Sequence, residues 1–139
     1  MDIEFVRNFF NHDRYLVHTG VIIEEIGEDY CKCSMKIENK HLNAADMAQG
    51  GAIYTLADSA FAVATNIGHL ERGEDLVTIS QSASISYLRA VPGGTLYAEG
   101  RKIGGGKKMS LYRMDVTDEQ GRIVATMNGN AYTVPKRPK

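Results

Sequence analysis

The fold is decided by residues 49–66, which read Gln49-Gly50-Gly51-Ala52-Ile53-Tyr54-Thr55-Leu56-Ala57-Asp58-Ser59-Ala60-Phe61-Ala62-Val63-Ala64-Thr65-Asn66. Two glycines open a segment that is apolar nearly all round, and such a segment is typical of a buried helix. Asp58 is the one formally charged side chain between Asp46 and Glu71. A carboxylate seldom stays buried without a partner or a chemical role. Asp58 is therefore predicted either to form an ion pair in the core or to take part in chemistry.

The sequence around this helix, which is expected over about residues 50–67, predicts a sheet. Glycine-rich connections separate the later strands and are short enough for hairpins, so the pairing is expected to be mainly antiparallel. Short helical segments are expected over residues 2–11 and 12–18, and strands over residues 20–26, 30–37, 76–89, 95–103, 109–118 and 122–134. We therefore predict one α+β domain over residues 1–139, with a long buried helix against an antiparallel sheet of about six strands.

Composition excludes several classes of protein. A formal net charge of -1 gives no sign of a protein that binds nucleic acid or an anionic membrane. The acidic start, Met1-Asp2-Ile3-Glu4, does not predict a signal peptide. The apolar stretch over residues 51–67 is shorter than the ~20 residues that a membrane span needs. No membrane partner and no nucleic-acid partner are predicted.

The two cysteines, Cys31 and Cys33, are too few for a disulfide framework, so a cytoplasmic location is expected. They alternate with polar residues along a predicted strand together with Met35 and Ile37, which indicates one buried face. A Cys-x-Cys pair without a second pair is poor support for a metal site, and the four histidines show no ligand spacing. No metal site is predicted.

Five short motifs, in this order along the chain, make the prediction more specific. They are His41-Leu42-Asn43, Gln49-Gly50-Gly51, Thr55-Leu56-Ala57-Asp58-Ser59-Ala60-Phe61, Ser84-Ile85-Ser86-Tyr87-Leu88-Arg89-Ala90 and Gly121-Arg122-Ile123-Val124-Ala125, with Ala64-Thr65-Asn66 extending the third. Together they resemble the hotdog-fold acyl-CoA thioesterases of the phenylacetic-acid-degradation (PaaI) type. The resemblance implies a sheet wrapped around the helix, an acyl-CoA substrate and no metal or redox cofactor. It also implies a homodimer with one continuous sheet, often doubled into a tetramer.

The resemblance also implies catalytic roles. The amide of Gly50 would polarise the thioester carbonyl, and Asp58 would be the nucleophile or the general base that activates water. Asn43 would help to hold the carboxylate, the water or the thioester, and Ser80 lies where some relatives place a water-orienting hydroxyl. Gln49 stands where relatives usually have histidine. Glutamine still donates and accepts hydrogen bonds but does not titrate near neutral pH, which argues against proton transfer at this position.

Helix geometry adds a condition of its own. Gly50 and Asp58 are eight residues apart, so they lie about 12 Å apart on one helix at ~1.5 Å per residue. Reacting groups must come within roughly 3.5 Å of each other. If both residues act on one carbonyl, they must come from different subunits, and the active site belongs to a dimer interface.

The acyl group is expected between two central helices, against Tyr54, Phe61 or the N-terminal helical segment. The resemblance also implies that basic side chains beside Gly104-Gly105-Gly106, or Arg89, meet the phosphates of coenzyme A. The predicted substrate-binding residues are Gly51, Tyr54, Phe61, Arg89, Lys107 and Lys108. For the two lysines, the alternative is a glycine hairpin with solvated side chains.

Other interpretations remain open from the sequence. Asp58 can form a buried salt bridge to Arg89 or to a lysine across the interface. The Gly50-Gly51 pair can serve close helix–sheet packing, and Asn43 can be only a turn or cap residue. One alternative function is a hotdog hydratase or dehydratase, although Gln49 occupies the natural place of the histidine it needs. Another is a non-catalytic module that binds acyl-CoA.

Overall fold

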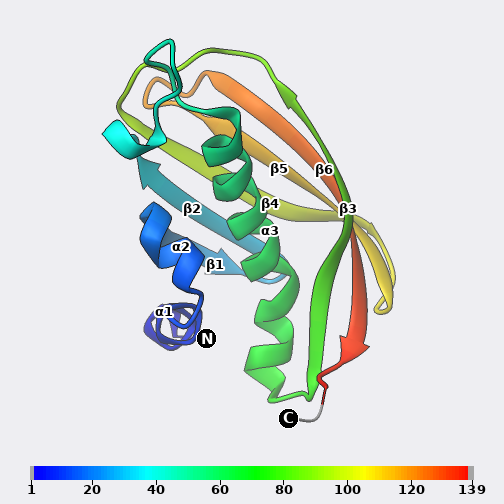
Figure 1. The fold of residues 1–139 in the computed structure, drawn as a ribbon. Helices are drawn as coiled ribbons and strands as arrows, with labels where there is room; N and C mark the ends of the chain where they lie inside the picture. The colour runs from blue at the N-terminus through cyan, green and yellow to red at the C-terminus, as the bar shows by residue number, and fades with distance from the viewer. Residues whose placement is uncertain (1, 138–139) are drawn as a thin grey trace.

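A computed structural model describes residues 2–137 as a curved six-stranded sheet wrapped around one long helix (Figure 1). All strand pairs are antiparallel, and the order across the sheet is β1-β2-β4-β5-β6-β3. The elements are α1 (Ile3–Phe10), α2 (Arg14–Thr19), β1 (Val21–Gly27), β2 (Tyr30–Lys36), the 3-10 turn η1 (Asn39–His41), α3 (Gly50–Arg72), β3 (Leu76–Tyr87), β4 (Thr95–Gly105), β5 (Met109–Thr117) and β6 (Ile123–Pro135). The predicted α+β hotdog architecture is confirmed.

The end of the central helix was predicted too early. Gly68 was expected to follow the helix, but α3 continues through it to Arg72. The helix stops at Gly73, whose φ of 61° is left-handed and whose N–H reaches the carbonyls of His69 and Leu70. A single internal glycine costs only about 1 kcal/mol relative to alanine, and packing of the last turns on the sheet overrides that cost.

The core lies between α3 and the concave face of the sheet. Leu56, Ala60, Phe61 and Val63 of α3 are buried there. The helix approaches the sheet closely at Gly129 of β6, where a Cβ would lie 2.8 Å from Cζ of Phe61. This close approach fixes the level of α3, and therefore of Asp58, relative to the strands.

Strand β2 carries the predicted inward face. Cys31, Cys33 and Met35 are fully buried, and the two thiols are free with their sulfurs 3.6 Å apart. The period-two alternation of this strand therefore buries the predicted residues. Within residues 2–137, no group of three or more histidine, cysteine or acidic residues is arranged to hold a metal ion.

The edge strand β3 is attached to α3 as well as to β6. The side chain of Asn66 accepts from the N–H of Thr78 at 2.8 Å and donates to its carbonyl at 2.9 Å. His69 adds a contact of 2.8 Å from Nε2 to Oγ1 of the same threonine. These bonds hold the start of β3 beside the second half of the helix.

The N-terminal helices α1 and α2 lie beside β1, the strand at one edge of the sheet (Figure 1). His41 ties the loop before α3 to α2, because its Nε2 lies 2.7 Å from the carbonyl of Thr19. Its Nδ1 accepts from the N–H of Glu38 at 2.8 Å. His41 is buried and structural. None of the helices among the described residues is long and apolar enough to cross a membrane.

Candidate active site

The first turn of α3 offers one unused backbone donor. Gln49 is the N-cap, and its Oε1 accepts from the N–H of Gly51 at 2.7 Å. The N–H groups of Ala52 and Ile53 both point to the carbonyl of Gln49, at 2.9 and 3.2 Å. Among the hydrogen bonds of residues 2–137, none takes the N–H of Gly50. The positive end of the helix dipole therefore presents Gly50 as its free donor.

The loop before the helix is fixed from two directions. The N–H of Gln49 donates to the carbonyl of His41 at 2.7 Å, and the N–H of Ala48 donates to the carbonyl of Val91 at 2.7 Å. Asn43 is exposed, and its Oδ1 accepts from the N–H of Ala45 at 2.8 Å and from the N–H of Met47 at 3.2 Å. Asn43 thus has the turn role that the sequence left open.

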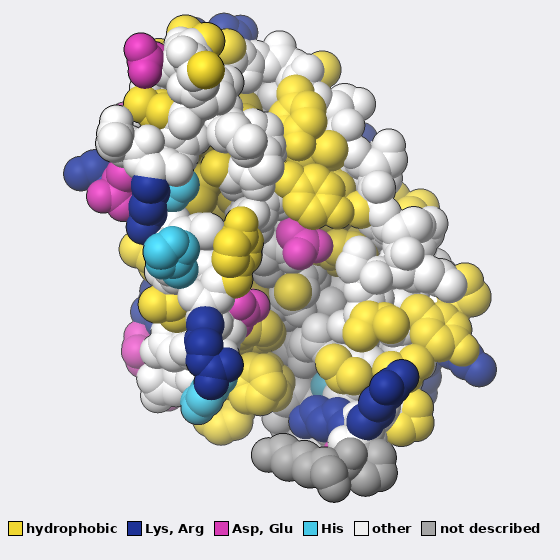
Figure 2. Space-filling view, viewed as in Figure 1, with side chains coloured by type: hydrophobic (Ala, Val, Ile, Leu, Met, Phe, Trp, Pro, Cys, Tyr) yellow, Lys and Arg dark blue, Asp and Glu magenta, His cyan; other side chains and the backbone are white. Residues whose placement is uncertain are grey.

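Asp58 lies two helical turns further along, at a pocket of about 230 Å³ between α3 and β3. The pocket is lined by Asp58, Phe61, Ala62, Thr65, Thr78, Ile79 and Ser80. The structure therefore brings together Asp58 and Ser80, which are far apart in sequence. Figure 2 shows hydrophobic side chains along this face between α3 and β3, interrupted by an acidic one.

The carboxylate of Asp58 has neither an ion pair nor a hydrogen bond within residues 2–137. Burial raises its pKa, and the negative charge of Asp13, the N-cap of α2, raises it further. Asp58 therefore forms no salt bridge to Arg89 within residues 2–137, and a salt bridge to a lysine across an interface stays a prediction. An unpaired, partly buried carboxylate with a raised pKa is suited to act as a base.

The two aromatic candidates, Tyr54 and Phe61, differ in how deeply they are buried. Tyr54 is half-buried one turn before Asp58, and the pKa of its hydroxyl is raised by burial and by the negative charge of Asp58. Phe61 is only 2% exposed and packs on Tyr112 with ring centres 5.7 Å apart. Phe61 therefore belongs to the core and contributes to the floor of the Asp58 pocket, whereas Tyr54 lies between the two catalytic candidates.

The basic candidates do not come together. Arg89 follows the end of β3, whereas Lys107 and Lys108 lie in the turn between β4 and β5. The carbonyl of Lys108 accepts from the N–H of Thr133, which pairs with Thr78 near the start of β3. The length of β3 from Thr78 to its end at Tyr87 is about 30 Å at ~3.3 Å per residue. One protomer therefore cannot offer Arg89 and the lysines to the same phosphate.

Tyr87 was not predicted as a site residue, yet it touches Gly50. Its hydroxyl donates to the carbonyl of Gly50 at 3.0 Å, across 37 positions of sequence. Only its place in the fourth of the five motifs, Ser84–Ala90, marked it in the sequence. Local periodicity does not reveal a contact between a strand end and a helix start.

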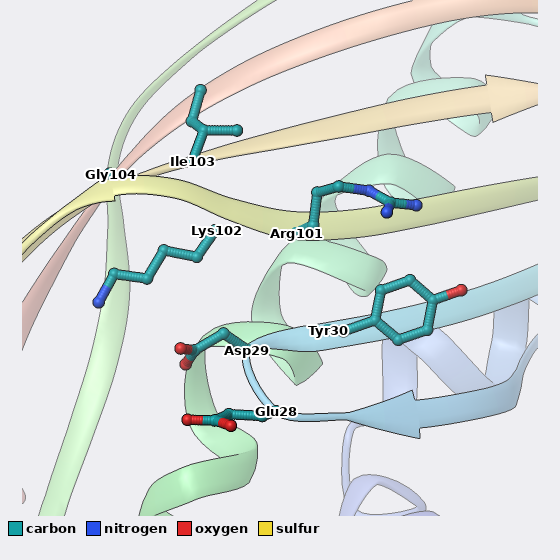
Figure 3. Close-up of a pocket in the computed structure, with 7 residues that line it drawn as sticks. All are labelled: Glu28, Asp29, Tyr30, Arg101, Lys102, Ile103 and Gly104. Carbon is teal, nitrogen blue, oxygen red and sulfur yellow. The ribbon is translucent and has the colours of Figure 1, made fainter.

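A second hollow of about 600 Å³ contains none of the predicted site residues. It lies at the β1–β2 turn and β4, and it is lined by Glu28, Asp29, Tyr30, Arg101, Lys102, Ile103 and Gly104 (Figure 3). Asp29 accepts from the hydroxyl of Tyr112 at 3.2 Å, and Arg101 lies over the ring of Tyr30. These contacts are structural, so the Asp58 pocket is the better candidate for chemistry.

The start of the wrapped helix presents a free amide, and an unpaired carboxylate lies midway along it. A backbone donor is chemically able to polarise a carbonyl and a carboxylate to attack it or to activate water, which is the chemistry of enzymes that act on acyl thioesters. The chain belongs to the thioesterase superfamily, which matches residues 47–125, a segment that includes Gly50 and Asp58. It is a thioesterase of the PaaI type, an enzyme that hydrolyses acyl thioesters.

Individual relatives agree with this membership. A protein from Archaeoglobus fulgidus is 31% identical over 95% of this chain and 83% of its own length. Its name describes it as an inferred esterase. The acyl-coenzyme A thioesterase PaaI of Escherichia coli is 25% identical over 90% of this chain and 86% of its own. The structure of E. coli PaaI superposes with a TM-score of 0.83, at 24% identity, over 94% of this chain and 91% of that one.

Proposed function

We propose that the enzyme hydrolyses acyl-CoA thioesters to a free acid and coenzyme A at sites shared between two subunits. One observation carries this proposal: the same helix bears a free N–H at Gly50 and, two turns further on, an Asp58 carboxylate without a partner in the described protomer. The name of the E. coli relative, an acyl-coenzyme A thioesterase, supports the coenzyme A part of the substrate.

In each site, the N–H of Gly50 of the partner subunit holds the thioester carbonyl oxygen. Asp58 either removes a proton from water or attacks the carbonyl carbon itself. The carbonyl oxygen gains negative charge as the new C–O bond forms, and the helix N-terminus stabilises that charge. The C–S bond then breaks, and coenzyme A leaves as a thiolate. If Asp58 is the nucleophile, water hydrolyses the resulting mixed anhydride. One well-aimed donor is worth about 10²–10³ in kcat.

The remaining predicted catalytic residues have supporting roles. With its Oε1 held by Gly51, the amide nitrogen of Gln49 is left to donate beside Gly50, so Gln49 supplies a second donor to the carbonyl oxygen. Ser80 lines the Asp58 pocket and orients the attacking water. Asn43 acts mainly by shaping the loop before the helix, and its amide nitrogen is left to meet the substrate.

The proposed homodimer is supported by the edge strand β3. Its outer edge has no further strand among residues 2–137, and Ile79 and Tyr87 on it are 47% and 49% exposed. Pairing of two such edges would join the sheets and would remove an exposed edge that favours aggregation. A tetramer would be a pair of these dimers.

The substrate then spans several predicted residues. The acyl group lies in the Asp58 pocket with Tyr54 and Phe61 beside it, and Gly51 leaves the backbone accessible. Arg89 meets a phosphate of coenzyme A, because it lies two positions beyond Tyr87, which contacts Gly50. No metal or redox cofactor takes part. The free thiols of Cys31 and Cys33 fit the proposed cytoplasmic location.

The first experiment measures free-thiol release from phenylacetyl-, benzoyl- and C4 to C12 acyl-CoA. Gly50→Pro removes the donor at the first helical position, where proline is tolerated. Both Gly50→Pro and Gly50→Ala place a Cβ against the ring of Tyr87, but Gly50→Ala keeps the N–H, so it separates loss of the donor from that contact. We expect Asp58→Asn and Gly50→Pro to abolish turnover as separate proteins. Mixed dimers of the two variants should regain about half of the wild-type activity per dimer, because one site then has both groups.

Failure to regain activity in mixed dimers would show that each site is built within one subunit. Tight binding of acyl-CoA without thiol release by the wild-type protein would replace the hydrolase with a binding module. In that case the free Gly50 donor and the Asp58 carboxylate would serve recognition alone.

A further inference from the structure

The ring of Tyr87 occupies the place that a side chain at position 50 would take. A Cβ built on Gly50 would lie 3.2 Å from Cζ of Tyr87, 3.4 Å from its hydroxyl oxygen and 3.5 Å from Cε1. The same hydroxyl donates to the carbonyl of Gly50 at 3.0 Å. The tyrosine thus touches both the α-carbon side and the carbonyl of the residue that carries the free donor.

The backbone on both sides of the Gly50 α-carbon is consequently anchored. The peptide plane that contains the Gly50 N–H is held through the Gln49 carbonyl, which accepts from Ala52 and Ile53. The next peptide plane, which contains the Gly50 carbonyl, is held by Tyr87. Without a side chain of its own, Gly50 has the largest conformational freedom of any residue. The contact with Tyr87 removes that freedom at the point where the donor must be aimed.

The strand end that carries Tyr87 is itself firmly placed. Tyr87 pairs with Ala125 of β6, and the next two N–H groups, of Leu88 and Arg89, both point to the carbonyl of Val124, at 2.7 and 3.3 Å. Residue Val91, four positions beyond Tyr87, accepts from the loop before the helix. The end of β3 therefore positions the helix start from two directions.

We propose that Tyr87 is a positioning residue that aims the Gly50 N–H at the thioester carbonyl oxygen. This rests on the proposed function of Gly50 and extends it to a residue outside the helix. Tyr87 acts through Gly50, and its role is to keep the donor aligned before substrate arrives. Preorganised donors need no rearrangement during the reaction, which is the source of their effect.

Tyr87→Phe tests the hydroxyl and leaves the ring in place. We expect kcat to fall by about 10-fold with KM nearly unchanged, because a misaimed donor weakens binding of the transition state more than binding of the substrate. Tyr87→Ala also removes the ring and should lower kcat further. Tyr97→Phe is the matched control, since its hydroxyl makes no hydrogen bond among residues 2–137 and it lies on β4.

A second measurement does not depend on turnover. In amide NMR spectra without substrate, Tyr87→Phe should shift the Gly50 and Gly51 resonances and lower the backbone order parameter of Gly50, whereas Tyr97→Phe should leave both unchanged. Unchanged Gly50 resonances and an unchanged order parameter would overturn the proposal. So would a Tyr87→Phe enzyme with wild-type kcat, or one in which only KM rises, because Tyr87 would then be a simple binding contact.

The two proposals fail differently. A wild-type protein that releases no thiol from any substrate would refute the proposed hydrolysis and would leave the NMR result to decide whether Tyr87 fixes Gly50. An active wild type with an unaffected Tyr87→Phe variant would refute the positioning role alone.

Discussion

Gly129→Ala should destabilise the fold through one contact at the centre of the core. The added Cβ would lie 2.8 Å from Cζ and 3.1 Å from Cδ2 of Phe61, and closer still to Cε2. Carbon atoms pack at about 3.5–4.0 Å. The ring must therefore move by roughly 1 Å, but it is 2% exposed and rests on Tyr112. Overpacking of this kind costs about 1–3 kcal/mol.

A cost of about 2 kcal/mol corresponds to a drop of about 6 °C in Tm for a chain of this length. Calorimetry or circular dichroism at one fixed protein concentration measures it, since the melting of an oligomer depends on concentration. Gly104→Ala is the matched control, because a Cβ on that strand glycine meets nothing within 4 Å. Its Tm should stay close to that of the wild type.

Phe61→Leu removes the ring atoms that the new Cβ would meet. The double variant Gly129→Ala/Phe61→Leu should therefore be no less stable than Phe61→Leu alone. The coupling between the two positions then equals the whole cost of Gly129→Ala, about 2 kcal/mol. A Tm for Gly129→Ala equal to that of the wild type, or strictly additive effects in the double variant, would refute the contact between helix and sheet at this point.

Three further outcomes are expected. Asp58→Asn should abolish thiol release and raise Tm near neutral pH. Burial raises the folded pKa of Asp58, so its charge destabilises the fold above the unfolded value of 3.8, and the gain in Tm should vanish as pH falls below that value. Asn66→Ala should lower the free energy of unfolding by about 2 kcal/mol, because two backbone groups of Thr78 lose their partner; equal urea midpoints would contradict this. Arg89→Ala should raise KM for acyl-CoA several-fold and leave KM unchanged for a short acyl-pantetheine thioester, while Lys108→Ala should alter neither KM. If Lys108→Ala instead raises KM for acyl-CoA and Arg89→Ala does not, the phosphate site lies at the β4–β5 turn.

Much of the fold could be predicted because its signals are local. The strand bounds expected from alternation and glycine breakers agree with the structure within two residues. Alternation at Cys31, Cys33 and Met35 identified the inner face of β2, since side chains of a strand point to opposite faces in turn. The end of α3 could not be predicted in this way, because glycine at position 68 and glycine at position 73 look equally suited to end a helix. Packing against the sheet decides which one does.

The sequence by itself determined the class of fold, the acid midway along the apolar helix at Asp58 and the glycine at the helix start. It also required two subunits if both residues act on one carbonyl, because the rise of a helix fixes their separation. Only the tertiary structure decided that Ser80 joins Asp58 in one pocket, that Gln49 takes the Gly51 donor, and that Tyr87 covers Gly50. Periodicity shows which face of an element is buried. It carries no information on which distant residue lies opposite, because that depends on how the strands and the helix pack together.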